Sequence, residues 1–213
     1  GQRLVAYLPR YAPLLAPLAP LLNSTATLPG ARRVLESLTG LTRHRALPRW
    51  HRAAGLKRMT TAGPVSGTEV VVLLDTFTRW FEPANGQALV DVLSAAGCHV
   101  HIARPKRGRP LCCGRTFLSA GLIDQARYEA SRLIRALRPY LDRGIPLVGL
   151  EPACLLTLRD EYKDLFPAGE TEGLDGMALL LEEYLVKNRT SLSLEFGSSP
   201  VSHAALHCHC HQK

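Results

Sequence analysis

The order of apolar and polar stretches predicts alternating strands and helices after residue 67. Residues 69–75, EVVVLLD, form an apolar run of strand length, whereas residues 86–97 place their aliphatic side chains on one helical face. Further strands are expected at 98–103, 145–151 and 203–208, and further helices at 122–141, 154–166 and 175–188. This alternation predicts an α/β fold, with a parallel sheet, right-handed crossovers and helices on both faces.

The first 66 residues have a different pattern. Four prolines (Pro9, Pro13, Pro17 and Pro20) interrupt a leucine-rich stretch. Because proline lacks the backbone donor and its ring clashes with the preceding turn, a regular helix should be broken repeatedly there. A helix-compatible stretch follows at 30–41, and residues 61–67, TAGPVSG, have the composition of a linker. We therefore expect a Pro-rich helical arm, or interdomain connector, over residues 1–66.

The net charge of +8 belongs to this arm. Residues 1–66 hold ten Lys or Arg against one acid, whereas residues 67–213 hold sixteen against seventeen. No nucleic-acid-binding motif accompanies the charge, so we expect no nucleic-acid partner. Two interpretations of the arm stay open: a connector across a partner domain with its basic side chains in water, or a segment lying on an anionic membrane surface. No apolar run reaches the roughly 18 residues of a membrane-spanning helix, and no export signal is visible.

Reactive side chains follow the predicted strands. Asp75 ends the first strand, Cys112 and Cys113 follow the second, and Cys154 follows the third. The carboxyl ends of parallel strands share one edge of a sheet, where ligands bind, so these residues are expected to converge. Gly114 should let the backbone turn so that both vicinal thiols approach one centre. Cys154 also begins a helix, a position that favours a thiolate, the form that binds iron and other soft metals.

The other cysteines and histidines give weaker signals. The ending HCHCHQK supplies further candidate metal ligands, His209, Cys210 and His211, although a solvated polar terminus explains the same residues. Cys98 opens a strand and is expected to be a buried, inert thiol. The cysteine spacings match neither a zinc ribbon nor a disulfide framework. Four basic residues flank the vicinal cysteines and could offset negative charge there or simply be solvated: Arg104, Lys106, Arg107 and Arg109.

Four segments together resemble a known family. They are VVVLLDTFTRWFEP (70–83), RPLCCGRTFLSAGLID (109–124), GLEPACLLTLRDEY (149–162) and LHCHCHQK (206–213). This combination is similar to the cysteine-rich (CCG) domain iron-sulfur oxidoreductases, and most similar to the C-terminal region of bacterial FAD-linked oxidases of the D-lactate or glycolate dehydrogenase type. The resemblance implies one full CCG repeat over 67–200 and the start of a truncated second repeat over 201–213.

The resemblance also implies a cofactor. Two repeats of this family hold a cubane iron-sulfur cluster, and Cys112, Cys113 and Cys154 match its cysteine pattern. Asp75 stands where the family's first cysteine is usual, and the later CxxC pair lacks its second cysteine. A four-iron cluster is thus one ligand short, and Asp75 or Cys210 could complete it, although iron prefers thiolate.

The expected function is electron transfer within a flavin-dependent 2-hydroxy acid dehydrogenase. FAD is expected on a missing upstream domain, and the fragment alone is not a complete catalyst. The resemblance implies flavin and ferredoxin-like domains as partners, a quinone or another carrier as acceptor, and a cytoplasmic location with peripheral contact at the inner face of the membrane. The alternatives are a structural or docking module with a degenerate site, or a zinc site built from Cys and His.

Overall fold

The computed structural model describes residues 1–25, 28, 30–52, 56, 59–167, 169–195, 197–198, 201–206 and 209–210, and contains a five-stranded sheet in the order β1-β3-β2-β4-β5. The strands are β1 (Thr61–Ala62), β2 (Thr68–Leu73), β3 (Cys98–Ile102), β4 (Leu147–Gly149) and β5 (Ala178–Leu180). Strands β2 to β5 run parallel, and only β1 pairs antiparallel, with β3. The predicted α/β fold with a mainly parallel sheet is confirmed.

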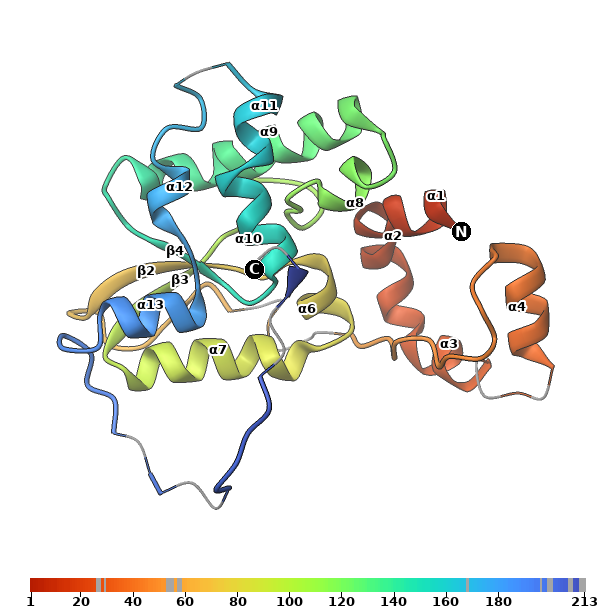
Figure 1. Cartoon of the computed structure of the whole chain (residues 1–213), viewed down its shortest axis with the longest axis horizontal. Helices are drawn as coiled ribbons and strands as arrows, with labels where there is room; N and C mark the ends of the chain where they lie inside the picture. Colours follow the sequence, from red (N-terminus) through yellow and green to blue (C-terminus); the bar gives the residue numbers. More distant parts are fainter. Residues whose placement is uncertain are drawn as a thin grey trace.

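Helices cover both faces of the sheet (Figure 1). On one face lie α9 (Ile123–Leu141), α10 (Pro152–Arg159) and α11 (Glu161–Leu165), and on the other lie α7 (Pro83–Ala95) and α13 (Leu181–Lys187). Strand β2 shows why two layers form. Successive side chains of a strand point to opposite faces, so Val71 packs in the core with α9 and α10, whereas Val70 and Val72 pack with α7. Both faces of this central strand are therefore buried, as its continuous apolar run predicts.

Three predicted elements differ from the structure. The helix expected over 154–166 is two helices, α10 and α11, which separate at Asp160. The helix expected over 175–188 is instead a short helix α12 (Leu174–Met177), the strand β5 and then α13. A short apolar run does not distinguish strand from helix, and β5 forms because it pairs with β4, which is distant in sequence. The predicted linker at 61–67 contains β1, so the sheet begins earlier than expected.

The prediction of a strand at 203–208 is also wrong in its described part. Residues 203–206 have no regular structure, and residues 207 and 208 lie outside the described residues. Residues 203–206 therefore do not extend the sheet. Two further short helices, α6 (Thr76–Trp80) and α8 (Arg115–Leu118), lie next to the carboxyl ends of the strands and bear on the candidate site.

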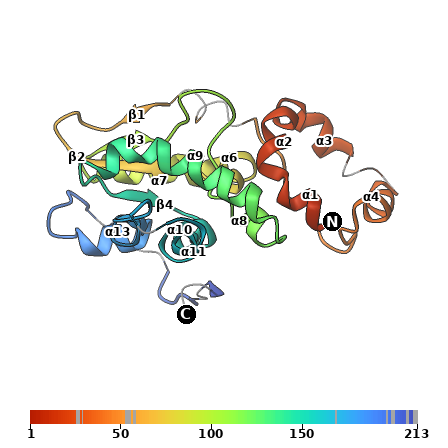
Figure 2. The same cartoon turned by 90° about the horizontal axis from the view of Figure 1, so that it is seen from above.

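The N-terminal arm is a series of short helices, as its prolines predict. They are α1 (Gln2–Ala6), α2 (Leu8–Leu15), the 3₁₀ helix η1 (Ala16–Leu18), α3 (Ala19–Thr25) and α4 (Ala31–Thr39). Figure 2 shows this arm in red and orange at the end of the sheet that carries α6 and α8. Prolines occupy the first turns of α2, η1 and α3, where a missing donor is tolerated, and only Pro13 lies inside a helix of the arm as the structure describes it.

The arm packs against the α/β unit of its own chain. Leu8, Ala12 and Ala16 form a buried cluster with Trp80 of α6, and Ala6 packs against Phe117 of α8. Arg10 reaches Glu129 in an ion pair of 3.1 Å, so this basic side chain of the arm is not simply solvated, whereas Arg32, Arg33 and Arg52 are exposed. Within the described residues, no helix has the length and apolar content needed to cross a bilayer.

Candidate functional site

Three cysteine thiols meet at the carboxyl edge of the sheet. Cys113 Sγ lies 2.8 Å from Cys154 Sγ, although 41 residues separate them in sequence. The Cys112 thiol lies beside them and hydrogen-bonds to Cys113. All three cysteines are free and buried. The convergence expected from strand topology is thus present for Cys112 and Cys113, which precede α8, and for Cys154 in the first turn of α10.

Gly114 allows the segment between β3 and α8 (residues 103–114), called the cysteine loop because it carries Cys112 and Cys113, to approach α9 closely. Its φ of +87° lies in the left-handed region, and it precedes the first residue of α8. A Cβ atom at this position would lie 2.8 Å from the backbone oxygen of Ala126 in α9. The Gly114 amide also donates a 3.3 Å hydrogen bond to Cys112 Sγ. The glycine therefore serves both the turn and the packing of the loop against α9.

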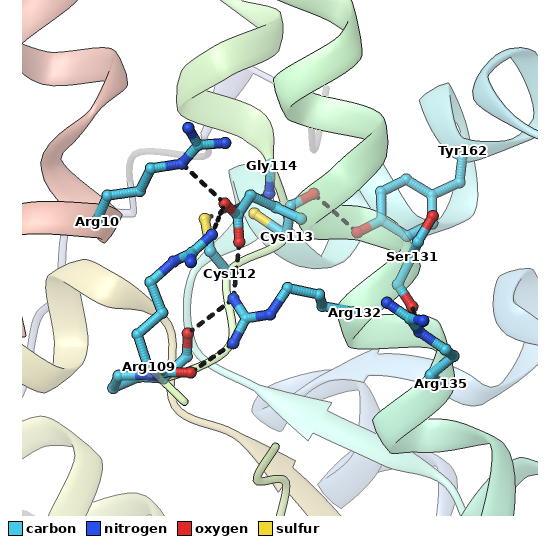
Figure 3. A network of polar contacts seen from close by, with 11 residues as sticks. Arg10, Arg109, Cys112, Cys113, Gly114, Ser131, Arg132, Arg135 and Tyr162 are labelled. Atoms are coloured by element: carbon cyan, nitrogen blue, oxygen red, sulfur yellow. Dashed lines mark hydrogen bonds and ion pairs between the residues drawn. The ribbon is translucent and has the colours of Figure 1, made fainter. Parts of the chain in front are cut away.

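The backbone of the loop is held from a second direction. The Tyr162 hydroxyl of α11 donates a 2.7 Å hydrogen bond to the backbone oxygen of Cys113 (Figure 3). Tyr162 is fully buried and belongs to the same buried cluster as Cys113 and Cys154. The tyrosine had no distinctive signal in the sequence, because its position only continues the apolar face of a helix.

Burial keeps the thiols protonated in the absence of a compensating charge. The hydrogen bond from Cys112 to Cys113 and burial raise the pKa of Cys112 well above its ordinary value. For Cys154, the hydrogen bond from Cys113 lowers the pKa, but burial and the nearby charge of Asp75 outweigh it and raise the pKa to about 11. This corrects the expectation that the helix start makes Cys154 a thiolate. Because a bound cation inverts such shifts, these thiols would ionise readily only against a metal centre.

Asp75 and Glu151 begin helices at the same edge. Asp75 Oδ1 accepts hydrogen bonds from the amides of Phe77 (2.7 Å) and Thr78 (3.1 Å), and its Oδ2 accepts one from the Thr78 hydroxyl. Burial raises the pKa of Asp75, and these hydrogen bonds oppose the rise. Glu151 caps α10 by accepting from the Ala153 amide at 3.2 Å. The Asp75 carboxylate is therefore close to the thiols and already serves as a helix cap.

The candidate metal ligands near the C-terminus do not form a metal-binding group in the described part of the chain. Cys210 is exposed, whereas His209 is half-buried and close enough to Glu151 to lower the pKa of that carboxyl, against the larger effect of burial. His211 lies outside the described residues. Among the residues that the structure describes, no three Cys, His, Asp or Glu side chains are arranged to hold a single metal ion. The site thus offers three soft donors but not a finished ligand set.

Cys98 lies apart from these thiols. It starts β3, at the opposite end of the strand from the cysteine loop, and its buried Sγ is 3.5 Å from the Tyr184 hydroxyl. The expectation of a buried thiol is confirmed.

A buried carboxylate behind the cysteine loop was missed in the sequence. Glu129 of α9 is 0% exposed and forms ion pairs with Arg10 of the arm, with Arg109 and, at 2.8 Å, with Arg132. Figure 3 shows these three arginines converging beside Cys112 and Cys113. The only sequence signal is that Glu129 falls three residues after Ala126 on the apolar face of its helix. One carboxylate thus links the arm, the cysteine loop and α9.

The chain is similar to parts of known dehydrogenase proteins, although no protein-family model and no solved structure match it. It is 26% identical over 158 residues, 70% of its length, to a subunit of the anaerobic glycerol-3-phosphate dehydrogenase of Escherichia coli strain K12, and it spans 38% of that protein. It is 32% identical over 120 residues, 55% of its length, to the D-2-hydroxyglutarate dehydrogenase of Pseudomonas putida, of which it spans 11%. The chain therefore corresponds to a limited part of each relative.

Proposed function

We propose that this chain is an iron-sulfur electron-transfer segment of a flavin-dependent 2-hydroxy acid dehydrogenase of the D-lactate or glycolate type. The observation that supports the proposal most directly is the meeting of Cys112 and Cys113, from the segment before α8, with Cys154 of α10 at the carboxyl edge of the sheet. The two named relatives, a dehydrogenase subunit and a dehydrogenase, support an oxidoreductase role. FAD belongs, in this proposal, to another domain of the parent protein or complex.

The chemistry of the donors suits iron. A four-iron cluster supplies one-electron transfer when bound, and proteins hold it through cysteine thiolates. Cys112, Cys113 and Cys154 would be three of its ligands, each giving up its thiol proton on binding. Asp75 or Cys210 would complete the set. Asp75 would have to share oxygens that already accept helix-capping hydrogen bonds, and Cys210 would have to leave its exposed position.

The remaining residues of the site hold the ligands in place. Gly114 and Tyr162 fix the backbone of the cysteine loop, and the ion pairs of Glu129 fasten that loop to α9 and to the arm. Rigid support of this kind keeps ligand atoms oriented and limits the access of water. Electrons would arrive from the flavin and leave for a quinone or another carrier. Contact of the arm with the inner face of the membrane, in the cytoplasm, would bring the site near a membrane-borne acceptor.

A second candidate is a structural or docking module whose site is degenerate or binds zinc. The observation that favours its degenerate form is the incomplete ligand set: the described residues contain no group of three arranged to bind one metal ion, and Asp75 is engaged as a cap. The two candidates differ in the metal that the purified protein carries and in whether that metal is redox-active.

Anaerobic reconstitution with ferrous iron and sulfide tests the proposal. The wild-type chain should bind iron and acid-labile sulfide and develop the broad visible absorption of thiolate-to-iron charge transfer. Cys113→Ser and Cys154→Ser should lose most of the iron. Cys98→Ser is the matched control, because it alters a buried cysteine that lies apart from the three thiols and should leave the iron content unchanged.

Three results would contradict the proposal. One is a wild-type chain that binds no iron, and another is equal loss of iron in Cys98→Ser and Cys154→Ser. The third is stoichiometric zinc that ferrous iron and sulfide do not replace, which would favour the zinc form of the alternative. Unfolding curves of each apo variant show whether a loss of iron reflects a lost ligand or a lost fold.

A further inference from the structure

A positively charged cavity lies beside the cysteine loop. It has a volume of about 470 Å³ and is formed by the segment after β3 and by the exposed side of α9. Five of its eight lining residues carry a positive charge, and none carries a negative one: Arg104, Lys106, Arg107, Arg132 and Arg135. Pro105, Ala136 and Pro139 supply the rest of the surface. The hollow therefore combines cationic walls with a small apolar part.

The charges around this cavity are poorly neutralised. In the described part of the chain, Arg104, Lys106, Arg107 and Arg135 make no ion pair with a carboxylate. Arg132 does pair with Glu129, but that single carboxylate also serves two other arginines. Like charges held together in a concave surface raise the local concentration of anions. The cavity thus has an excess of positive charge that the protein itself does not balance.

Two of the arginines that line the cavity are held in place by hydrogen bonds to backbone oxygens. Arg104 donates from Nη2 to the backbone oxygens of Leu56 (3.0 Å) and Met59, and its buried Nε has no hydrogen-bond partner among the described atoms. Arg132 donates from Nη2 to the backbone oxygen of Arg109 at 2.5 Å. Guanidinium groups held in place lose less entropy on binding an anion than mobile surface chains do.

A buried arginine, Arg79, adds to the positive charge near Arg104. Arg79 of α6 is buried, its Nε has no hydrogen-bond partner among the described atoms, and burial together with the charge of Arg104 lowers its pKa to about 10. Asp75 only partly opposes this effect. An anion in the cavity would therefore relieve repulsion that extends from the surface to the carboxyl edge of the sheet.

We propose that this cavity is a binding site for the phosphate group of a small phosphate-bearing molecule. Arginine forks match the geometry of phosphate oxygens, and a dianion offsets more of the five charges than a single carboxylate does. The volume exceeds that of a phosphate group alone, so an organic part of the ligand can also enter, against the apolar side chains. The hollow shape favours a small ligand over an acidic protein surface.

Phosphate binding can be measured without any metal in the protein. Calorimetric titration of the full chain with inorganic phosphate and with pyrophosphate, at about 0.1 M NaCl, limits the contribution of distant charges. Saturable binding to one site is expected, tighter for pyrophosphate. The double variant Lys106→Gln/Arg107→Gln should weaken it by about tenfold or more, since one charge-assisted hydrogen bond contributes roughly that factor.

The control is a variant with the same net charge. Lys187→Gln/Arg189→Gln removes two exposed positive charges at and after the end of α13, which does not line the cavity, and should bind phosphate as the wild type does. Equal weakening in both double variants would overturn the proposal, because it would show a general effect of net charge. Absence of saturable phosphate binding would overturn it too, and binding of polyglutamate alone would instead indicate an acidic protein partner. Because these titrations use metal-free protein, their failure leaves the iron-sulfur proposal untouched.

Discussion

Replacing Gly114 by alanine tests whether the cysteine loop is built on a backbone that only glycine tolerates. The new Cβ would lie 2.8 Å from the backbone oxygen of Ala126, closer than a Cβ atom normally approaches another atom. That oxygen belongs to α9 and cannot rotate away as the end of a flexible side chain could. The loop or the helix must therefore shift, and the shift occurs directly beside the thiols of Cys112 and Cys113.

Two costs add at this position. A non-glycine residue in the left-handed region costs about 1–2 kcal/mol, and overpacking against a fixed neighbour costs a further ~1–3 kcal/mol. Gly121→Ala separates them, because Gly121 has a φ of +70° but open space around its Cβ position. We expect the control to lose only the conformational part of the free energy of unfolding, and Gly114→Ala to lose both parts.

Urea unfolding followed by circular dichroism measures both variants against the wild type. At roughly 2–4 °C per kcal/mol for a chain of this size, thermal unfolding should resolve the same difference. A cost in Gly114→Ala no larger than the cost in Gly121→Ala would refute the close approach to α9. Iron content after reconstitution adds a second readout: it should fall in Gly114→Ala and not in Gly121→Ala, since only the former displaces the thiols.

Three further changes test other parts of the structure by urea unfolding. Glu129→Gln should lower the free energy of unfolding by about 3–5 kcal/mol, because it removes the buried carboxylate that neutralises three partly buried arginines; a loss under about 1 kcal/mol would contradict the burial of that charge. Tyr162→Phe removes the hydrogen bond to the Cys113 oxygen and should cost about 1–3 kcal/mol, since a buried acceptor is left unpaired; an unchanged midpoint would contradict this. The hydrogen bond from Arg159 lowers the pKa of Glu183, so its contribution exists above the carboxyl's ordinary pKa and is lost as the pH falls through the lowered value. Glu183→Gln should therefore destabilise the protein at neutral pH by at most about 1 kcal/mol and match the wild type in acid, and a difference that grows in acid would refute the assignment.

The Glu129 network shows where local pattern reasoning fails. On α9, the apolar residues repeat at helical spacing and predict the buried face correctly. The same repeat makes a glutamate on that face look like an error in the pattern. Its partners, Arg10 and Arg109, come from the arm and from the cysteine loop, and neither contact is implied by the spacing within α9. A buried charge becomes tolerable only through such distant partners, so its role is visible only in the folded chain.

The strand β5 gives a similar lesson for secondary structure. Residues 178–180 lie in an apolar run directly before α13, and from helix propensity alone they are predicted to be part of that helix. Pairing with β4 decides the outcome, because it supplies hydrogen-bond partners for the backbone groups of residues 178–180. Residues 203–206 show the reverse, since a strand was predicted over 203–208 and this described part has no regular structure.

Residue pattern alone was enough to predict the α/β class, the parallel sheet with helices on both faces, the interruption of the arm at its prolines and the carboxyl edge as the place where Cys113 and Cys154 meet. These follow from side-chain periodicity, from proline's missing donor and from the common polarity of parallel strands, all of which act locally or through topology. Packing in three dimensions decided the raised pKa of Cys154, the engagement of Asp75 as a cap and the gathering of five cations around one cavity. Electrostatic energy depends on burial and on distances between groups remote in sequence, and those are set when the chain packs.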